Sequence, residues 1–144
     1  MGVKSIYIDS NIFISPLIYE DSPLASSSKR VLAMVEKGET TAYTSTLTWD
    51  EVVWVVRRVL GRADSVQAGE KLAAYPNLRF VSASEEIIRS AQKLLSEYGV
   101  APRDAIHIAS ALNKNVDALV SDDSELDLVR EVKREGSYSF KMKR

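Results

Sequence analysis

The chain has 144 residues, of which 45% are apolar and 27% charged, and its 19 basic and 20 acidic residues nearly balance. This composition is typical of one globular domain, which we predict to span residues 1–144. The absence of cysteine excludes disulfides, zinc–thiolate sites and thiol nucleophiles. Because the chain has only one histidine, any metal site must use mainly oxygen ligands, which favours Mg²⁺ or Mn²⁺ over Zn²⁺.

The sequence also indicates where the protein acts. No apolar run approaches the ~20 residues that a membrane-spanning helix needs. The first residues lead directly into a strand-like segment, without the apolar region of a signal peptide. We therefore expect a cytoplasmic protein that does not contact a membrane. The near-neutral charge neither indicates nor excludes nucleic acid, because a local basic patch or bound cations can attract phosphate.

Turn residues and hydrophobic periodicity predict the elements in chain order. The first half is predicted to contain a strand at 3–8, a loop up to 23, a helix from Ser26 or Ser27 to Gly38, a strand at 40–44 and a helix at about 48–60. The second half is predicted to contain a helix at 62–74, a strand at 78–81, a helix from Ser82 or Ser84 to Gly99, a helix at 102–112, a strand at 116–120, a short helix near 126–132 and an edge strand at 138–140.

Strands that alternate with helices indicate an α/β fold. Connections of this kind place the strands parallel to one another, with helices on both faces of the sheet. We therefore predict a three-layer α/β/α domain with a mainly parallel sheet. The sequence shows no internal repeat or linker that would indicate a second domain.

The acidic residues fall at informative places relative to these elements. Asp9 follows the first predicted strand, and Asp122 and Asp123 follow the strand at 116–120. Glu51 and Asp104 lie in the first turns of two predicted helices. In an open α/β sheet, strand carboxyl ends and the helix starts that follow them line one edge, where ligands bind. Four separate segments would therefore bring carboxylates to one crevice.

Carboxylates gathered in this way predict a metal site. They repel one another, so one must hold a proton or a cation must lie among them. Mg²⁺ and Mn²⁺, as one or two ions, suit such oxygen ligands and also bind phosphate oxygens. The predicted chemistry is hydrolysis of phosphodiester bonds by water. Each carboxylate taken alone also fits a turn, a helix cap or the helix dipole, so the prediction depends on their joint position.

Four segments carry a resemblance to a known family: IYIDSNIFI (6–14), STLTWDEVVWVVRR (45–58), PRDAIHIASAL (102–112) and LVSDDSEL (119–126). In their order and spacing, from residue 3 to about 129, the chain resembles the PIN-domain family. Within this family it resembles the VapC-type toxins of prokaryotic toxin–antitoxin pairs, and the third segment is the most specific. The resemblance implies a 3-2-1-4-5 strand order, Mg²⁺ or Mn²⁺ dependence, endoribonuclease activity and frequent homodimers.

The resemblance also assigns roles to individual residues. The catalytic and metal-binding carboxylates that it implies are Asp9, Glu51, Asp104 and Asp123. Asn11 and Ser121 match polar positions that support these acids, and Ser121 keeps the hydroxyl of the commoner threonine. Asp122 is the alternative fourth acid, and Glu125 lies where a second, less regular acid often occurs.

Other residues have two interpretations each. His107 lies three positions after Asp104, so the two share a helix face. Its residue type allows a catalytic base, but the position favours a histidine that orients its neighbours or packs in a helix interface. Arg57, Arg58 and Arg62 are candidates for RNA phosphate contacts. The alternative is a solvated helix end that complements the helix dipole.

The expected partners are an RNA substrate, a second copy of the chain and an antitoxin protein. An RNA-processing PIN nuclease without an antitoxin is the first alternative. The second is an aspartyl-phosphate phosphatase, although that family needs a second aspartate where this chain has Asn11. The third is a non-catalytic module whose acidic pocket docks a basic partner. Metal-dependent RNA cleavage that Asp9→Asn or Asp104→Asn abolishes would distinguish the nuclease from these last two.

Overall fold

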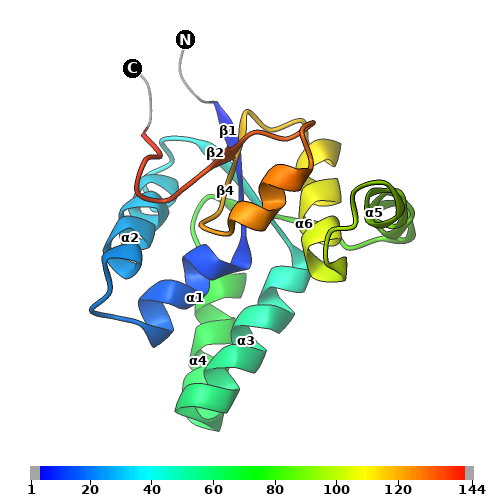
Figure 1. Ribbon diagram of the computed structural model, residues 1–144. Helices are drawn as coiled ribbons and strands as arrows, with labels where there is room; N and C mark the ends of the chain where they lie inside the picture. Colours follow the sequence, from blue (N-terminus) through cyan, green and yellow to red (C-terminus); the bar gives the residue numbers. More distant parts are fainter. Residues whose placement is uncertain (1–3, 142–144) are drawn as a thin grey trace.

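The structure is a computed structural model that describes residues 4–141. The ends of the predicted domain, 1–3 and 142–144, and the predicted start of the first strand at residue 3 lie outside the described residues. Five strands form one sheet in the order β3-β2-β1-β4-β5, with helices on both faces (Figure 1). Every neighbouring pair of strands is parallel. The predicted three-layer α/β class and the strand order 3-2-1-4-5 are confirmed.

The sheet is built around a short apolar strand. The strands are β1 (Ser5–Ile8), β2 (Thr41–Ser45), β3 (Leu78–Val81), β4 (Ala118–Val120) and β5 (Arg134–Glu135). Ile6, Tyr7 and Ile8 in β1 are all fully buried, as expected for a central parallel strand that is covered on both faces. Because side chains alternate along a strand, Tyr7 faces the opposite layer from the two isoleucines.

The helices divide between the two faces of the sheet. They are α1 (Ser10–Ile18), α2 (Pro23–Glu36), α3 (Thr46–Leu60), α4 (Arg62–Ala73), α5 (Glu85–Tyr98), α6 (Pro102–Asn113) and the short 3₁₀ helix η1 (Ser124–Leu128). One core joins Ile6 and Ile8 to apolar side chains of α1 to α4. The other core joins Tyr7 to α5 and α6, which stand together on the opposite side (Figure 1). No helix within residues 4–141 is both long and apolar enough to cross a membrane.

The first helix was not predicted. Residues 10–18 were expected to be part of a loop because Pro16 usually interrupts a helix. The structure instead has α1 there, with Pro16 inside it. Asp9 caps the helix by accepting a hydrogen bond from the Ser10 N–H, and Ile12 and Phe13 are buried against the sheet. This packing outweighs the one backbone hydrogen bond that proline cannot donate.

Two helix starts were predicted too late. The second helix was expected to begin at Ser26 or Ser27, but Ser22 caps α2 by accepting the Ala25 N–H at 3.0 Å. The helix expected from 48 begins at Thr46, because the Ser45 hydroxyl accepts the Leu47 N–H. Glu51 therefore lies in the second turn of α3 rather than in its first.

The C-terminal segment also differs from the prediction. The short helix expected near 126–132 is η1, which is earlier and ends at Leu128. The edge strand is β5, not 138–140, which forms a turn closed by the Phe140 N–H on the Gly136 carbonyl. Arg134 in β5 donates to the carbonyl of Ser121 and to Asp127, and these contacts hold the strand against β4.

Candidate active site

Five carboxylates lie around the carboxyl edge of the sheet. Asp9 directly follows β1, and Asp123 and Glu125 follow β4. Glu51 extends from the second turn of α3 and Asp104 from the first turn of α6. The charges of Asp123, Asp9 and Glu125 all act on Asp104, and His107 contacts both Asp9 and Glu51. The structure thus brings the predicted acids Asp9, Glu51, Asp104 and Asp123 to one region.

Asp9 is held by a network of hydrogen bonds at the centre of this region. Its side chain is buried, and Oδ1 accepts the Ser10 N–H at 2.8 Å. Oδ2 accepts the Ser121 hydroxyl at 2.7 Å and the Asn11 amide at 3.3 Å. Asn11 also donates to the Ser121 hydroxyl oxygen at 3.1 Å. The two supporting polar residues from the sequence, Asn11 and Ser121, therefore both contact Asp9 and fix the orientation of its carboxylate.

Asp104, Asp123 and Glu125 form a trio of oxygen donors, which we call the acidic trio. One carboxylate oxygen from each lies within 4.8 Å of the others. Burial and then the negative charges of Asp123 and Asp9 raise the pKa of Asp104 to about 6. Among the ion pairs of residues 4–141, none gives the acidic trio a lysine or arginine partner. A hard divalent cation such as Mg²⁺ or Mn²⁺ fits this negatively charged, all-oxygen donor set.

The two consecutive aspartates after β4 have different environments. Asp122 accepts two hydrogen bonds from Ser137, one from the N–H at 2.7 Å and one from the hydroxyl at 2.6 Å. Asp123 belongs to the acidic trio, and its Oδ1 also caps η1 by accepting the Glu125 N–H at 3.0 Å. Asp122 thus anchors the C-terminal segment, whereas Asp123 faces the other acids.

Glu51 is joined to a buried histidine. His107 is 1% exposed, and its Nε2 lies 2.5 Å from Oε1 of Glu51 and 3.5 Å from Oδ1 of Asp9. Its Nδ1 lies 2.6 Å from Oη of Tyr7. Burial alone lowers the pKa of His107, but the hydrogen bond to Glu51 and the charge of Asp9 outweigh burial and raise it. Sequence reasoning missed Tyr7, because its position in β1 looks like that of any core residue.

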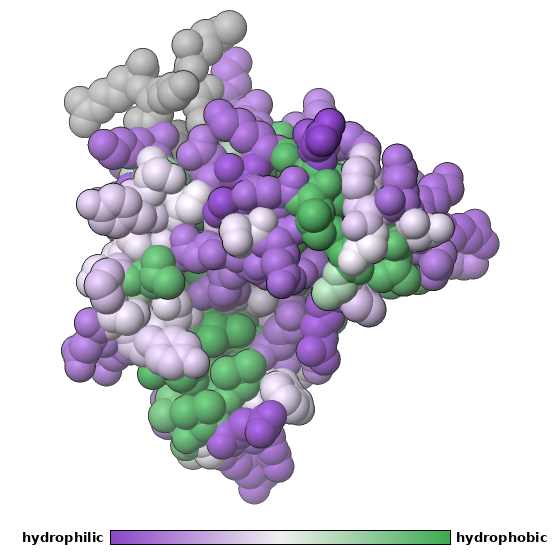
Figure 2. Space-filling view, in the orientation of Figure 1, coloured by the Kyte–Doolittle hydropathy of each residue, from purple (hydrophilic) through white to green (hydrophobic). Residues whose placement is uncertain are grey.

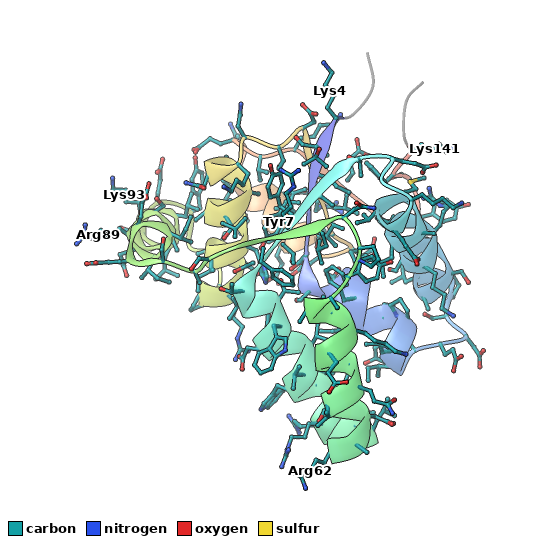
Figure 3. The ribbon with its side chains drawn as sticks, turned by 180° about the vertical axis from the view of Figure 1, so that it is seen from behind. Lys4, Tyr7, Arg62, Arg89, Lys93 and Lys141 are labelled. Carbon is teal, nitrogen blue, oxygen red and sulfur yellow. The ribbon has the colours of Figure 1, made fainter. Side chains whose placement is uncertain are left out.

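The arginine candidates lie outside the carboxylate region. Arg57 and Arg58 lie in the last turn of α3, and Arg58 stacks over the ring of Trp54 at 4.7 Å. Arg58 is seven residues beyond Glu51, about 10 Å along the helix. Arg62 lies at the far end of the α3–α4 hairpin (Figure 3). The structure therefore does not bring these arginines to the acids.

The surface over the region is suited to a polar ligand. In the orientation of Figure 1, the surface between α1, η1 and α6 is mostly hydrophilic (Figure 2). Green, hydrophobic residues gather lower down, toward the α3–α4 hairpin. There Val59, Leu60 and Val66 are about half exposed. A second green group lies to the right, toward α5 and α6, so apolar residues border the polar surface on two sides.

Comparisons with known proteins agree with this fold. Solved structures with a similar fold include VapBC2 from Rickettsia felis bound to a DNA fragment from its promoter, with a TM-score of 0.71 and 14% identity over 92% of this chain and 98% of that chain. VapC20 of Mycobacterium tuberculosis, described as a sarcin–ricin loop cleaving toxin, gives a TM-score of 0.71 and 16% identity over 85% and 92%. PAE2754 from Pyrobaculum aerophilum gives a TM-score of 0.58 and 17% identity over 92% and 83%.

The sequence itself gives the family. At 14–17% identity, the solved structures show a shared fold. No curated protein sequence matches the chain. The PIN domain profile matches residues 6–132, which include every carboxylate described above. The chain therefore belongs to the PIN domain family.

Proposed function

We propose that this protein is a metal-dependent endoribonuclease and the toxin of a VapBC-type toxin–antitoxin pair. Its membership of the PIN domain family and its fold similarity to VapC toxins support this proposal. The observation that carries it is the acidic trio next to Asp9, without a basic partner among the described ion pairs. Oxygen donors in such a group favour a cation that also binds phosphate.

We assign a role to each residue of the site from its contacts. Asp9, Asp104 and Asp123 would hold Mg²⁺ or Mn²⁺, as one or two ions, with Glu51 completing the set. When bound, the cation supplies positive charge to the phosphate oxygens and activates water as the nucleophile. Asn11 and Ser121 keep the Asp9 carboxylate in one orientation, so little reorganisation is needed when a ligand arrives. Asp9 is buried and Asp104 is half-buried, so their attraction for a cation is screened less than it would be in bulk water.

Related structures support the proposed substrate and partners. VapC20 is described as a sarcin–ricin loop cleaving toxin, and VapBC2 was solved bound to a DNA fragment from its promoter. We propose that this chain cleaves RNA and is inhibited by an antitoxin, and that it forms a homodimer, as the resemblance to VapC-type toxins implies. An RNA-processing nuclease without an antitoxin would use the same carboxylates.

The phosphatase alternative has less support from the geometry. That family needs a second aspartate two residues after the nucleophile, and an asparagine cannot take up or release a proton in its place. Asn11, which takes the place of the second aspartate of that family, donates to Asp9 and so orients it.

The test is RNA cleavage by the purified protein. Total RNA is incubated with the wild type in Mn²⁺, in Mg²⁺ and in EDTA, and the cut ends are mapped. We expect cleavage at defined sites with either cation, none in EDTA, and none by Asp9→Asn or Asp104→Asn. Asp64→Asn, which changes an exposed acid on α4, is the matched control and should cleave normally. Cleavage that survives both EDTA and the two site substitutions would refute the proposal.

A further inference from the structure

Three hydrogen-bonded side chains, those of Tyr7, His107 and Glu51, connect the central strand to the site, and we call them the Tyr7–His107–Glu51 network. The Tyr7 hydroxyl lies 2.6 Å from Nδ1 of His107, and Nε2 of His107 lies 2.5 Å from Oε1 of Glu51. Tyr7 is fully buried and His107 is 1% exposed, so water cannot replace either contact. Figure 3 shows Tyr7 at the centre of the molecule, within the sheet. The Tyr7–His107–Glu51 network thus connects the core to one carboxylate of the site.

The direction of these hydrogen bonds follows from the chemistry of each group. Nε2 of His107 faces carboxylates of Glu51 and Asp9, which only accept hydrogen bonds, so Nε2 must carry a proton. Nδ1 lies against the Tyr7 hydroxyl, which can donate to Nδ1 in the neutral ring and accept from Nδ1–H in the charged ring. In either state Nε2–H donates to Glu51, and the Tyr7 hydroxyl holds the opposite edge of the imidazole.

We propose that Tyr7 and His107 are positioning residues, which hold the Glu51 carboxylate toward the other acids through the hydrogen bond between the Tyr7 hydroxyl and Nδ1 and the hydrogen bond from Nε2–H to Oε1. A glutamate on a helix has three side-chain torsions and would otherwise sample several orientations. A donor from the core fixes one oxygen of Glu51 and leaves the other for a ligand. The inference rests on the proposed function, because it assigns Glu51 to the cation-binding set.

Packing alone does not account for these two residues. Both occupy the core between the sheet and α6, where Leu119 and Ile108 are also fully buried. A phenylalanine and a leucine would fill comparable space without polar atoms that need partners. The edge-on ring geometry of Tyr7 and His107, with centroids 5.8 Å apart at 62°, directs the hydroxyl to the imidazole edge. The polar atoms of Tyr7 and His107 are therefore explained by their hydrogen bonds in the Tyr7–His107–Glu51 network.

The first experiment observes the hydrogen bonds without any metal or activity. His107 is the only histidine, so ¹⁵N-histidine labelling of the metal-free protein gives imidazole signals of one residue. We expect a protonated Nε2 and an Nδ1 that is hydrogen-bonded to the Tyr7 hydroxyl. Tyr7→Phe removes only the hydroxyl, so the Nδ1 signal should shift to that of a nitrogen without a hydrogen-bond partner. Tyr75→Phe is the matched control, because it removes a hydroxyl that donates to the Leu32 carbonyl elsewhere.

The second experiment asks whether His107 acts through Glu51. Mn²⁺ affinity is measured by electron paramagnetic resonance for His107→Leu, Glu51→Gln and the double variant. Loss of a residue that orients a metal ligand weakens binding about 10-fold, and we expect this for His107→Leu. In the Glu51→Gln background the same change should alter the dissociation constant by less than about twofold, because coupled residues are not additive. His107→Gln, which retains a donor, should restore part of the affinity.

The outcomes separate this inference from the proposed function. The positioning roles alone are overturned if the wild type binds Mn²⁺ and cleaves RNA but the two substitutions have no effect. That result would be an unchanged Mn²⁺ affinity in His107→Leu and unchanged imidazole signals in Tyr7→Phe. A His107→Leu effect that persists in the Glu51→Gln background would overturn them as well. If the wild type neither binds Mn²⁺ nor cleaves RNA, the proposed function is overturned, and the positioning roles of Tyr7 and His107 are overturned with it. Thermal unfolding of each variant shows which of them are folded, and Tyr7→Phe is retained as the mildest change.

Discussion

Substitutions of the neighbouring acids Asp122 and Asp123 should have different effects, because Asp122 anchors the C-terminal segment and Asp123 belongs to the acidic trio. Asp122→Ala removes the two hydrogen bonds that its carboxylate accepts from Ser137. Ser137 is fully buried, so its N–H loses its partner and gains no water. Hydrogen bonds to a charged acceptor contribute about 1.5–3 kcal/mol, and an unsatisfied buried donor costs about 1–3 kcal/mol. We expect the free energy of unfolding to fall by about 2–4 kcal/mol.

Asp123→Asn should have the opposite effect, with nearly unchanged stability and weaker Mn²⁺ binding. Asparagine caps a helix as well as aspartate does, so η1 keeps its cap and the free energy of unfolding should change by less than about 1 kcal/mol. The acidic trio loses one of its charges, and Mn²⁺ affinity should weaken by at least about 10-fold.

Urea unfolding and Mn²⁺ titration of the two variants measure these effects side by side. For a chain of this length, the loss in Asp122→Ala corresponds to a fall in Tm of about 10 °C. Its Mn²⁺ affinity should stay within about twofold of the wild type, because changes at independent sites leave each other's energies intact. The reasoning is refuted if Asp122→Ala remains as stable as the wild type but loses Mn²⁺ binding to the extent that Asp123→Asn does.

Three further predictions concern stability. Mn²⁺ at 100 times its dissociation constant should raise the free energy of unfolding of the wild type by about 2.7 kcal/mol, and EDTA or Asp104→Asn should remove this gain in a urea titration. Ile108→Ala in the core should lower the free energy of unfolding by about 2–5 kcal/mol, whereas Ile88→Ala, 45% exposed, should have a much smaller effect. The hydrogen bond from Arg134 holds the pKa of Asp127 below its usual value, so this pair stabilises the fold above about pH 4 and less as the pH falls. Urea unfolding across an acidic pH series should therefore show a shallower decline for Asp127→Asn, and an unchanged decline would contradict the pairing.

The sheet and its acidic edge were predictable because local signals specified them. The apolar run before Asp9 and the run before Asp122 are each followed by turn residues, which identifies the ends of β1 and β4. Pro102 at the first turn of α6 located the start of the helix that bears Asp104. Parallel order then brings these ends to one edge.

What the sequence did not reveal depends on contacts between distant residues. Helix α1 was missed because Pro16 is a local interruption, whereas burial of Ile12 and Phe13 is a property of the folded core. Strand β5 has two polar residues and no periodicity, and its place depends on Arg134 bonding to Ser121 and Asp127.

The same holds within the site. The resemblance provided Asn11 and Ser121, but their hydrogen bonds to Asp9 join positions that are 2 and 112 residues away from it. Tyr7 and His107 are 100 residues apart, and no local pattern distinguishes this tyrosine from a core residue. The resemblance also pointed to Glu125, but its closeness to Asp104 and Asp123 depends on the path of η1.

The most direct test is a crystal structure of the wild type with Mn²⁺, with anomalous diffraction used to locate the ion. The account predicts an anomalous peak bound by carboxylate oxygens of Asp9, Asp104 and Asp123. A crystal with Mn²⁺ bound at other residues and none among these three carboxylates would contradict it.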